Sequence, residues 1–125
     1  MLTLEEIFND VANAPSFSHI DNINVGSRGK DGQSPLHWMA TLGDTGGIRL
    51  LLEAGADINS TDNSGNTPLH EAVVWRQTST ARFFIESGAD VLVKNHFGLT
   101  ALDIAKSDGF APTIELLHCA KRLER

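Results

Sequence analysis

The chain repeats itself with a period of 33 residues, and this periodicity limits its fold more than any other feature. Residues 32–37 read GQSPLH, residues 65–70 read GNTPLH and residues 98–103 read GLTALD. Aligning residues 32–64 with residues 65–97 gives ten identities, where chance at ordinary composition would give about two. A fixed period of this length predicts a stack of similar small units, each built from a few short elements.

The repeated segments resemble the T-P-L-H-x-A signature of the ankyrin repeat. The resemblance covers residues 22–123 well and residues 1–21 weakly. It implies an all-α solenoid of helix-turn-helix units joined by β-hairpin loops. We therefore expect one ankyrin-repeat domain over residues 1–125. Its expected parts are a degenerate N-terminal capping repeat at 1–31, repeats at 32–64 and 65–97, and a C-terminal capping repeat at 98–125.

Start and stop signals place two helices in each unit. Ser34, Thr67 and Thr100 are residues that cap helix N-termini, and proline follows the first two of them at a position where its missing N–H has no cost. The expected first helices of the first two full units end near residues 42 and 75, their second helices end at residues 55 and 88, and the last helix covers residues 113–123. Arg76 stands where the ankyrin family usually has glycine, so its turn must change geometry or accept strain.

The N-terminal segment predicts a different, shortened unit. Residues 3–13 carry apolar side chains at the spacing of an amphipathic helix. Ala14 and Pro15 end this pattern, and residues 17–21 leave room for a shortened second helix. An atypical terminal unit is expected in a repeat array, because it must present one face to water.

Composition limits the class of partner and the compartment. The formal charge of −6 comes from sixteen acidic and ten basic residues scattered without runs, which disfavours nucleic acid and anionic membranes. A protein partner with a basic surface fits this charge better. The single cysteine, Cys119, allows no internal disulfide and indicates a reducing compartment, where we expect it to pack as a small apolar group. We therefore expect a cytoplasmic protein that is a monomer when free.

The recurring histidines invite a metal or catalytic interpretation, which the geometry opposes. Equivalent residues of stacked units are about 8–10 Å apart, whereas zinc needs each nitrogen at about 2.0–2.1 Å. The ankyrin resemblance implies instead that His37 and His70 join neighbouring repeats through hydrogen bonds. The sequence contains no phosphate-binding loop and no nucleophile motif. We predict no catalytic residue, no metal site and no cofactor, and we treat an enzyme or metal protein using His37, His70 or Glu71 as a third alternative.

The ankyrin resemblance implies that the ends of the first helices and the tips of the hairpins form the binding surface. At these positions the predicted partner-binding residues are Leu42, Asn63, Ser64, Asn66, Val74, Trp75, Lys94, His96, Phe97 and Leu99. Two interpretations of Phe97 and Leu99 stay open: they cover the last unit, or they extend an apolar patch with Val74 and Trp75. Trp38 is likewise open between packing and binding.

The predicted function is protein binding through the concave face and the hairpin tips. We expect a small inhibitor or adaptor that occludes its partner. The alternative is an immunity protein that neutralises a toxin, since a small acidic cytoplasmic ankyrin protein resembles such proteins. The fold itself supports only the binding class and does not identify the partner.

Overall fold

The computed structural model describes residues 3–13 and 27–123. The helices of these ranges are α1 (Leu4–Ala12), α2 (Pro35–Leu42), α3 (Thr45–Glu53), α4 (Pro68–Val74), α5 (Thr78–Glu86), α6 (Ala101–Asp108) and α7 (Ala111–Leu123). The described ranges contain no β-strand, and in place of the expected β-hairpins they have loops closed by turns. The short helix expected at residues 17–21 lies outside the described residues.

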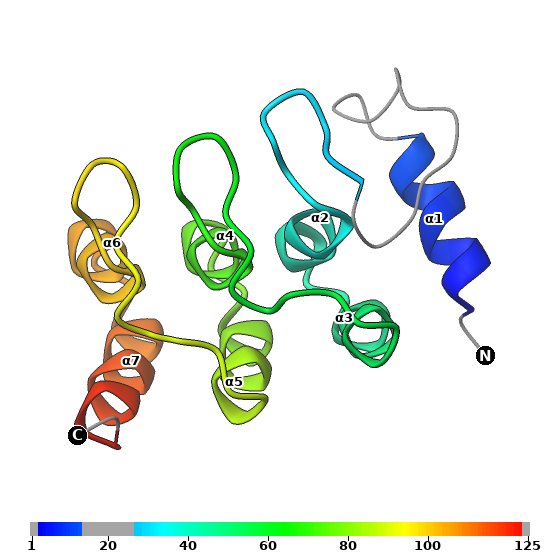
Figure 1. Cartoon of the computed structure of the whole chain (residues 1–125). Coiled ribbons are helices and arrows are strands. Elements are labelled where there is room, and N and C mark those ends of the chain that lie inside the picture. Colours follow the sequence, from blue (N-terminus) through cyan, green and yellow to red (C-terminus); the bar gives the residue numbers. More distant parts are fainter. Residues whose placement is uncertain (1–2, 14–26, 124–125) are drawn as a thin grey trace.

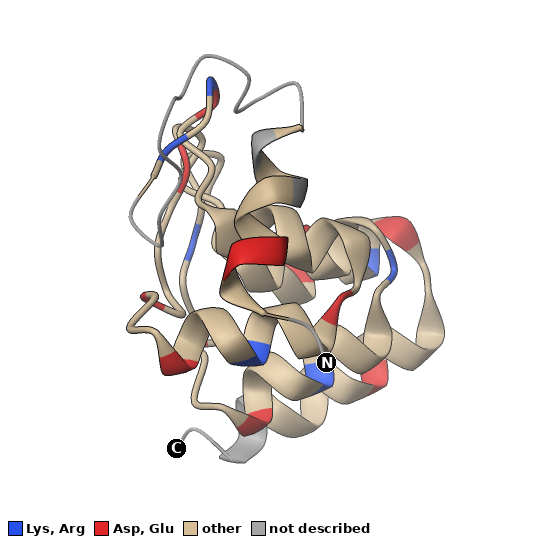
Figure 2. Ribbon diagram, turned by 90° about the vertical axis from the view of Figure 1, so that its right-hand side faces the viewer, with Lys and Arg blue, Asp and Glu red and all other residues tan. Residues whose placement is uncertain are grey.

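Six of these helices form two rows, and α1 lies beside α2 and α3 at one end of them (Figure 1). One row holds α2, α4 and α6, which we call the inner helices, and the other holds α3, α5 and α7, the outer helices. Each inner helix packs on its neighbour in the row and on the outer helix that follows it in sequence. The loops that precede the inner helices rise from one end of the helices (Figure 2). The inner helices and the loop segments directly before them, residues 27–34, 61–67 and 94–100, together form what we call the inner face.

Every inner helix begins in the same way, because the same short pattern precedes each of them. Ser34 and Thr67 have extended backbone, and their side-chain oxygens accept from the amides of His37 and His70. The histidine ring in turn accepts from the backbone amide of the capping residue, at 3.1 Å in both units. The third unit builds the same capping box with Asp103 in place of histidine. Two donors that a helix N-terminus leaves unpaired are satisfied each time.

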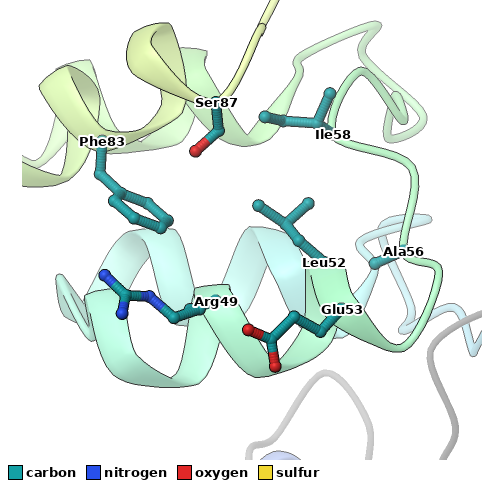
Figure 3. A pocket seen from close by; sticks show the side chains of 7 residues that line it. All are labelled: Arg49, Leu52, Glu53, Ala56, Ile58, Phe83 and Ser87. Carbon is teal, nitrogen blue, oxygen red and sulfur yellow. The ribbon is translucent and has the colours of Figure 1, made fainter.

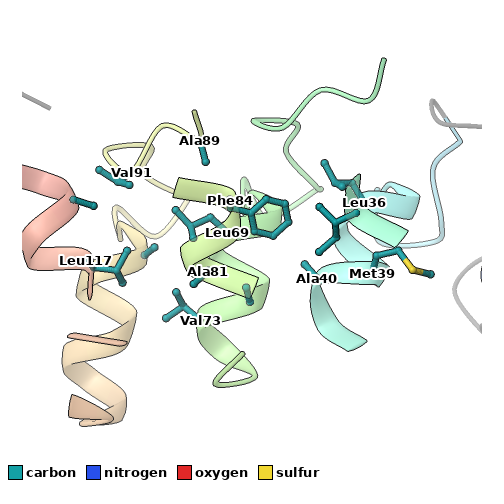
Figure 4. Packing of buried hydrophobic residues seen from close by; sticks show 14 of the residues in the cluster. Leu36, Met39, Ala40, Leu69, Val73, Ala81, Phe84, Ala89, Val91 and Leu117 are labelled. Carbon is teal, nitrogen blue, oxygen red and sulfur yellow. The ribbon is translucent and has the colours of Figure 1, made fainter. Parts of the chain in front are cut away.

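The core lies between the two rows and runs through all units. Leu36, Leu69 and Leu102 occupy equivalent places in the three inner helices and are at most 5 % exposed. In Figure 4 the ring of Phe84 extends from α5 toward the side of Leu36, and Leu117 of α7 closes the other end of the cluster. Each leucine therefore packs between neighbouring units, and no unit has a separate core.

Successive loops are joined through backbone hydrogen bonds one period apart. The amide of Asn63 donates to the carbonyl of Asp31 at 2.9 Å, and the amide of His96 donates to the carbonyl of Ser64 at 2.8 Å. Gly65 lies between two such loops at φ 80°, and a Cβ on it would be 2.7 Å from the Cδ2 atom of His96. Glycine is needed there both for the backbone angle and for the space.

Two expectations about the last helix were wrong. Cys119 is exposed, because α7 turns Leu117 and Ala120 toward the core and leaves Cys119 on the outer side. The helix also begins at Ala111, two residues before the expected Thr113. Pro112 does not prevent this, because the first turn of a helix needs no amide proton from it.

Candidate functional site

Large apolar side chains remain exposed at the ends of two inner helices and in the loop between α5 and α6. Among the described residues these are Leu42 (52 % exposed), Val74 (47 %), Trp75 (58 %), Leu92 (47 %), Phe97 (77 %) and Leu99 (39 %). All but Leu92 belong to the predicted partner-binding residues. Leu42, the last residue of α2, and Trp75, the residue after α4, are one period apart and thus occupy equivalent places in successive units. Exposed apolar groups that gather in this way are typical of interaction sites.

A cleft of about 390 Å³ lies between α4 and α6. Its apolar walls are Val74 of α4, Leu99 of the loop before α6, and Ile104 of α6. Its polar residues are Ser107 and Asp108. The structure therefore brings Val74 and Leu99 together, although they are 25 positions apart in the sequence. The prediction missed Ile104, whose only sequence signal is its place one period after Glu71 of α4.

Arg76 pairs with Asp108, one of the residues that line this cleft. Its Nε atom lies 2.9 Å from Oδ2 of Asp108 and its Nη2 atom lies 3.1 Å from Oδ1. The guanidinium also lies 5.1 Å from the ring centroid of Phe110. Arg76 has a φ of 57°, close to the angles of Gly43 and Gly109 at the equivalent turns. Arg76 thus keeps the turn geometry of the repeat, accepts the backbone strain, and adds a contact to the next unit.

The predicted residues of the loop tips fall into two groups. Asn63, Lys94, His96 and Phe97 are exposed, whereas Ser64 and Asn66 are half-buried. The carbonyl of Asn66 accepts from the His37 ring at 2.8 Å, and its side-chain oxygen accepts from the amide group of Asn95 at 2.9 Å. Asn66 is therefore part of the joint between loops, as well as a member of the inner face.

Phe97 is a highly exposed residue of the loop that precedes α6. Its side chain is 77 % exposed, while Leu99, two residues later, lines the α4–α6 cleft. Phe97 and Leu99 thus have different environments. Trp38, by contrast, is half-buried and packs against the core, so its large ring contributes to stability.

The recurring histidines have the structural role that the resemblance implied. Because Nδ1 accepts from a backbone amide, the ring proton is on Nε2, which donates to the carbonyl of Asn66 from His37 (2.8 Å) and of Leu99 from His70 (3.1 Å). Burial lowers the pKa of both histidines below 6.5 and outweighs the hydrogen bonds to these carbonyls, which raise it. The described residues contain no group of three His, Cys, Asp or Glu side chains placed to hold a metal ion.

A second hollow lies on the opposite side of the protein, between α3 and α5, with a volume of about 420 Å³. In Figure 3 the guanidinium of Arg49 and the ring of Phe83 lie at one end of it, and Ile58 lies at the other. The guanidinium carbon is 5.6 Å from the centroid of that ring. None of the predicted binding residues lines this hollow. The outer helices α3 and α5 each carry one arginine and one glutamate, Arg49 with Glu53 and Arg82 with Glu86.

Comparison with known proteins places the repeat in a family. A family model described as ankyrin repeats, in three copies, matches residues 8–95. No curated protein sequence matches the chain significantly. In residues 3–13 and 27–123 no helix has the length and apolar character needed to cross a membrane. Ankyrin repeats are generally protein–protein interaction modules. Since the matched segment covers well over half of the chain, this protein belongs to the ankyrin repeat family.

Proposed function

We propose that this protein binds a partner protein through its inner face and thereby acts as a small inhibitor or adaptor. The observation that carries this proposal is the exposed apolar group formed by Leu42, Val74 and Trp75 beside the α4–α6 cleft. Leaving these side chains in water gives the free protein no stability. When a partner covers them, the burial of their apolar area contributes to the free energy of binding. Aromatic side chains in such positions dominate binding energies at interfaces.

The two parts of the inner face have different roles in this proposal. The helix ends and the cleft supply the apolar contacts, and the loop tips supply polar groups at the rim, including Asn63, Lys94 and His96. This division matches the usual anatomy of protein interfaces, with an apolar centre and a polar edge. The hydrogen bonds between successive loops hold the rim in place before a partner arrives, which lowers the entropy cost of binding.

The test is capture of the partner from a lysate of the source cells, followed by affinity measurement with variants. Val74→Ala combined with Trp75→Ala should weaken binding by more than about 2 kcal/mol with unchanged helical content by circular dichroism. The matched control is Leu92→Ala, which removes an equally exposed apolar side chain outside the cleft and should leave the affinity unchanged. Equal losses of affinity in the double variant and the control would refute the proposed surface.

A more specific form of the proposal is an immunity protein that neutralises a basic toxin. The formal charge of −6 favours it, because an acidic protein attracts a basic partner over distances set by the ionic strength. A complex held by this attraction should form more slowly as salt is raised. An association rate that does not change between low and high salt would exclude this form while leaving the apolar surface intact.

We also propose that residues 1–125 form one solenoid domain that is a monomer when free and acts in the cytoplasm. The repeat boundaries proposed from the sequence are 1–31, 32–64, 65–97 and 98–125. The recurrence of the capping box at Ser34, Thr67 and Thr100 supports the last three. Sedimentation of the purified chain tests the oligomeric state, and limited proteolysis tests whether the whole length behaves as one unit.

A further inference from the structure

Glu71 breaks the pattern of the repeat at a position that faces the gap between inner helices. One period before it stands Trp38, and one period after it stands Ile104. Both of these side chains are half-buried and pack against the hydrophobic core. The central unit therefore has a carboxylate where the flanking units have large apolar groups. A residue that violates the local rule without a gain in packing is a candidate for function.

The surroundings of Glu71 do not neutralise its charge. Its side chain is half-buried, and burial followed by the nearby charge of Asp62 raises its pKa. The side chains of Trp75 and Thr41 lie within hydrogen-bonding reach but do not offset these effects. No basic side chain of the described residues forms an ion pair with Glu71, and Arg76, the nearest in sequence, is paired with Asp108.

The inner face thus has two neighbouring places of opposite chemical character. Between α4 and α6 the cleft is lined by Val74, Leu99 and Ile104. At the equivalent place between α2 and α4, Glu71 replaces the isoleucine and lies within reach of Thr41 and Trp75. Inner helices pack on each other directly, so the two places are separated by about one helix-packing distance, 8–10 Å.

We infer that Glu71 receives a basic side chain of the partner protein, while the α4–α6 cleft receives an apolar side chain about 8–10 Å away on the same partner. This inference rests on the proposed function and specifies the chemistry of the partner. A guanidinium or ammonium group on Glu71 would form a charge-assisted hydrogen bond in a partly desolvated site. The exposed ring of Trp75 beside it offers a face on which the same cation can lie. In a polyproline II segment, which has three residues per turn and a rise of about 3.1 Å per residue, residues three apart lie on the same face and span about 9 Å.

The test uses a defined probe, the peptide acetyl-Arg-Ser-Ser-Leu-amide, and a twin in which citrulline replaces arginine. Citrulline has nearly the same shape and no charge. Binding is followed by the indole N–H resonance of Trp75, assigned with Trp75→Phe. The arginine peptide should shift this resonance and bind about tenfold more tightly than the citrulline peptide, as expected for a hydrogen bond to a charged group. Glu71→Gln should abolish this difference.

The matched control is Glu86→Gln, which removes one negative charge from the exposed side of α5 and should preserve the tenfold preference. Equal binding of the two peptides to the natural protein, or a preference that survives Glu71→Gln, would overturn the inference. So would a failure of both peptides to shift the Trp75 resonance. A shift that appears on raising the concentration of the protein alone would assign the surface to a second copy of the chain.

Failure of this inference can be told apart from failure of the proposed function. If the variant with Val74→Ala and Trp75→Ala loses its captured partner but Glu71→Gln keeps it, the inner face binds a protein without a basic side chain at Glu71. If neither variant affects capture, the inner face itself is the wrong surface. Glu71→Gln should not destabilise the folded protein, because it removes a charge that burial disfavours. A loss of capture in this variant would therefore report on binding.

Discussion

The guanidinium of Arg76 joins the turn after α4 to Asp108 at the end of α6, with two hydrogen bonds of 2.9 and 3.1 Å. The two residues are separated by 32 positions, one less than the repeat period. Gly43 and Gly109 occupy the same turn in the flanking units, and all three have positive φ angles. In the central unit the side chain of Arg76 thus links two inner helices, at a position where the flanking units have glycine and therefore no side chain.

Replacing Arg76 separates the strain of its backbone from the contacts of its side chain. Arg76→Ala removes the contacts with Asp108 and Phe110 but keeps a Cβ in a left-handed conformation, whereas Arg76→Gly removes both the contacts and the strain. The glycine variant should therefore unfold at the higher temperature of the two. Thermal unfolding followed by circular dichroism measures this order. An alanine variant as stable as the glycine variant would mean that this backbone is not strained.

Leu69 should be among the residues most important for stability. It is 2 % exposed and lies in the central inner helix, packed between neighbouring units. Leu69→Ala should lower the free energy of unfolding by about 2–5 kcal/mol, because it leaves a cavity in the shared core. Urea unfolding measures the loss. The control Leu92→Ala changes an exposed leucine and should alter stability by no more than about 0.5 kcal/mol.

Gly65→Ala and Gly98→Ala should differ in cost, although their φ angles are 80° and 77°. Each variant places a Cβ in a left-handed conformation, which costs about 1–2 kcal/mol. Only at Gly65 would the new methyl group also meet the neighbouring loop, 2.7 Å from the His96 ring, since a Cβ on Gly98 would have nothing within 4 Å. The Gly65 variant should therefore lose more stability in urea unfolding. Equal losses would show that the loops separate at no cost.

Stability should fall when the pH drops below about 6.5, because burial lowers the pKa of His37 and His70 in the folded protein. The unfolded chain then binds protons that the folded chain resists, so stability that is complete above the unfolded pKa is lost as the pH falls toward the lowered folded pKa. Urea unfolding at a series of pH values measures the slope. The double variant His37→Gln and His70→Gln should flatten it, and an unchanged slope would assign it to other groups.

Glu71→Gln should stabilise the free protein at neutral pH. Burial and then Asp62 raise the pKa of Glu71, so the charged carboxylate opposes folding above that pKa, and the opposition disappears as the pH falls toward the unfolded value of 4.5. The variant should therefore be more stable than the natural protein near pH 7 and lose this advantage in acid. A variant less stable at pH 7 would show that the charge is already satisfied within the chain.

Much of the fold was predictable because its determinants are local. A serine or threonine followed directly by proline, with histidine three positions after the serine or threonine, specifies where a helix begins. These four residues form the capping box among themselves, so the rest of the chain is not needed for it. The left-handed turns at Gly43 and Gly109 follow from glycine in the same way. The β-hairpins expected from the resemblance are not formed as strands in the described residues. Their backbone groups pair in turns and with the next loop, so pairing between loops takes the place of strands.

The sequence by itself determined the period, the caps and the apolar face of each helix, because these depend on neighbours within one turn. It also indicated Leu42, Val74 and Trp75, since helix ends can be counted from the caps. Only the tertiary structure decided which of the predicted residues share a surface. The cleft of Val74, Leu99 and Ile104, the pairing of Arg76 with Asp108 and the half-burial of Glu71 all depend on the distance between stacked helices. That distance is set by packing across the whole array.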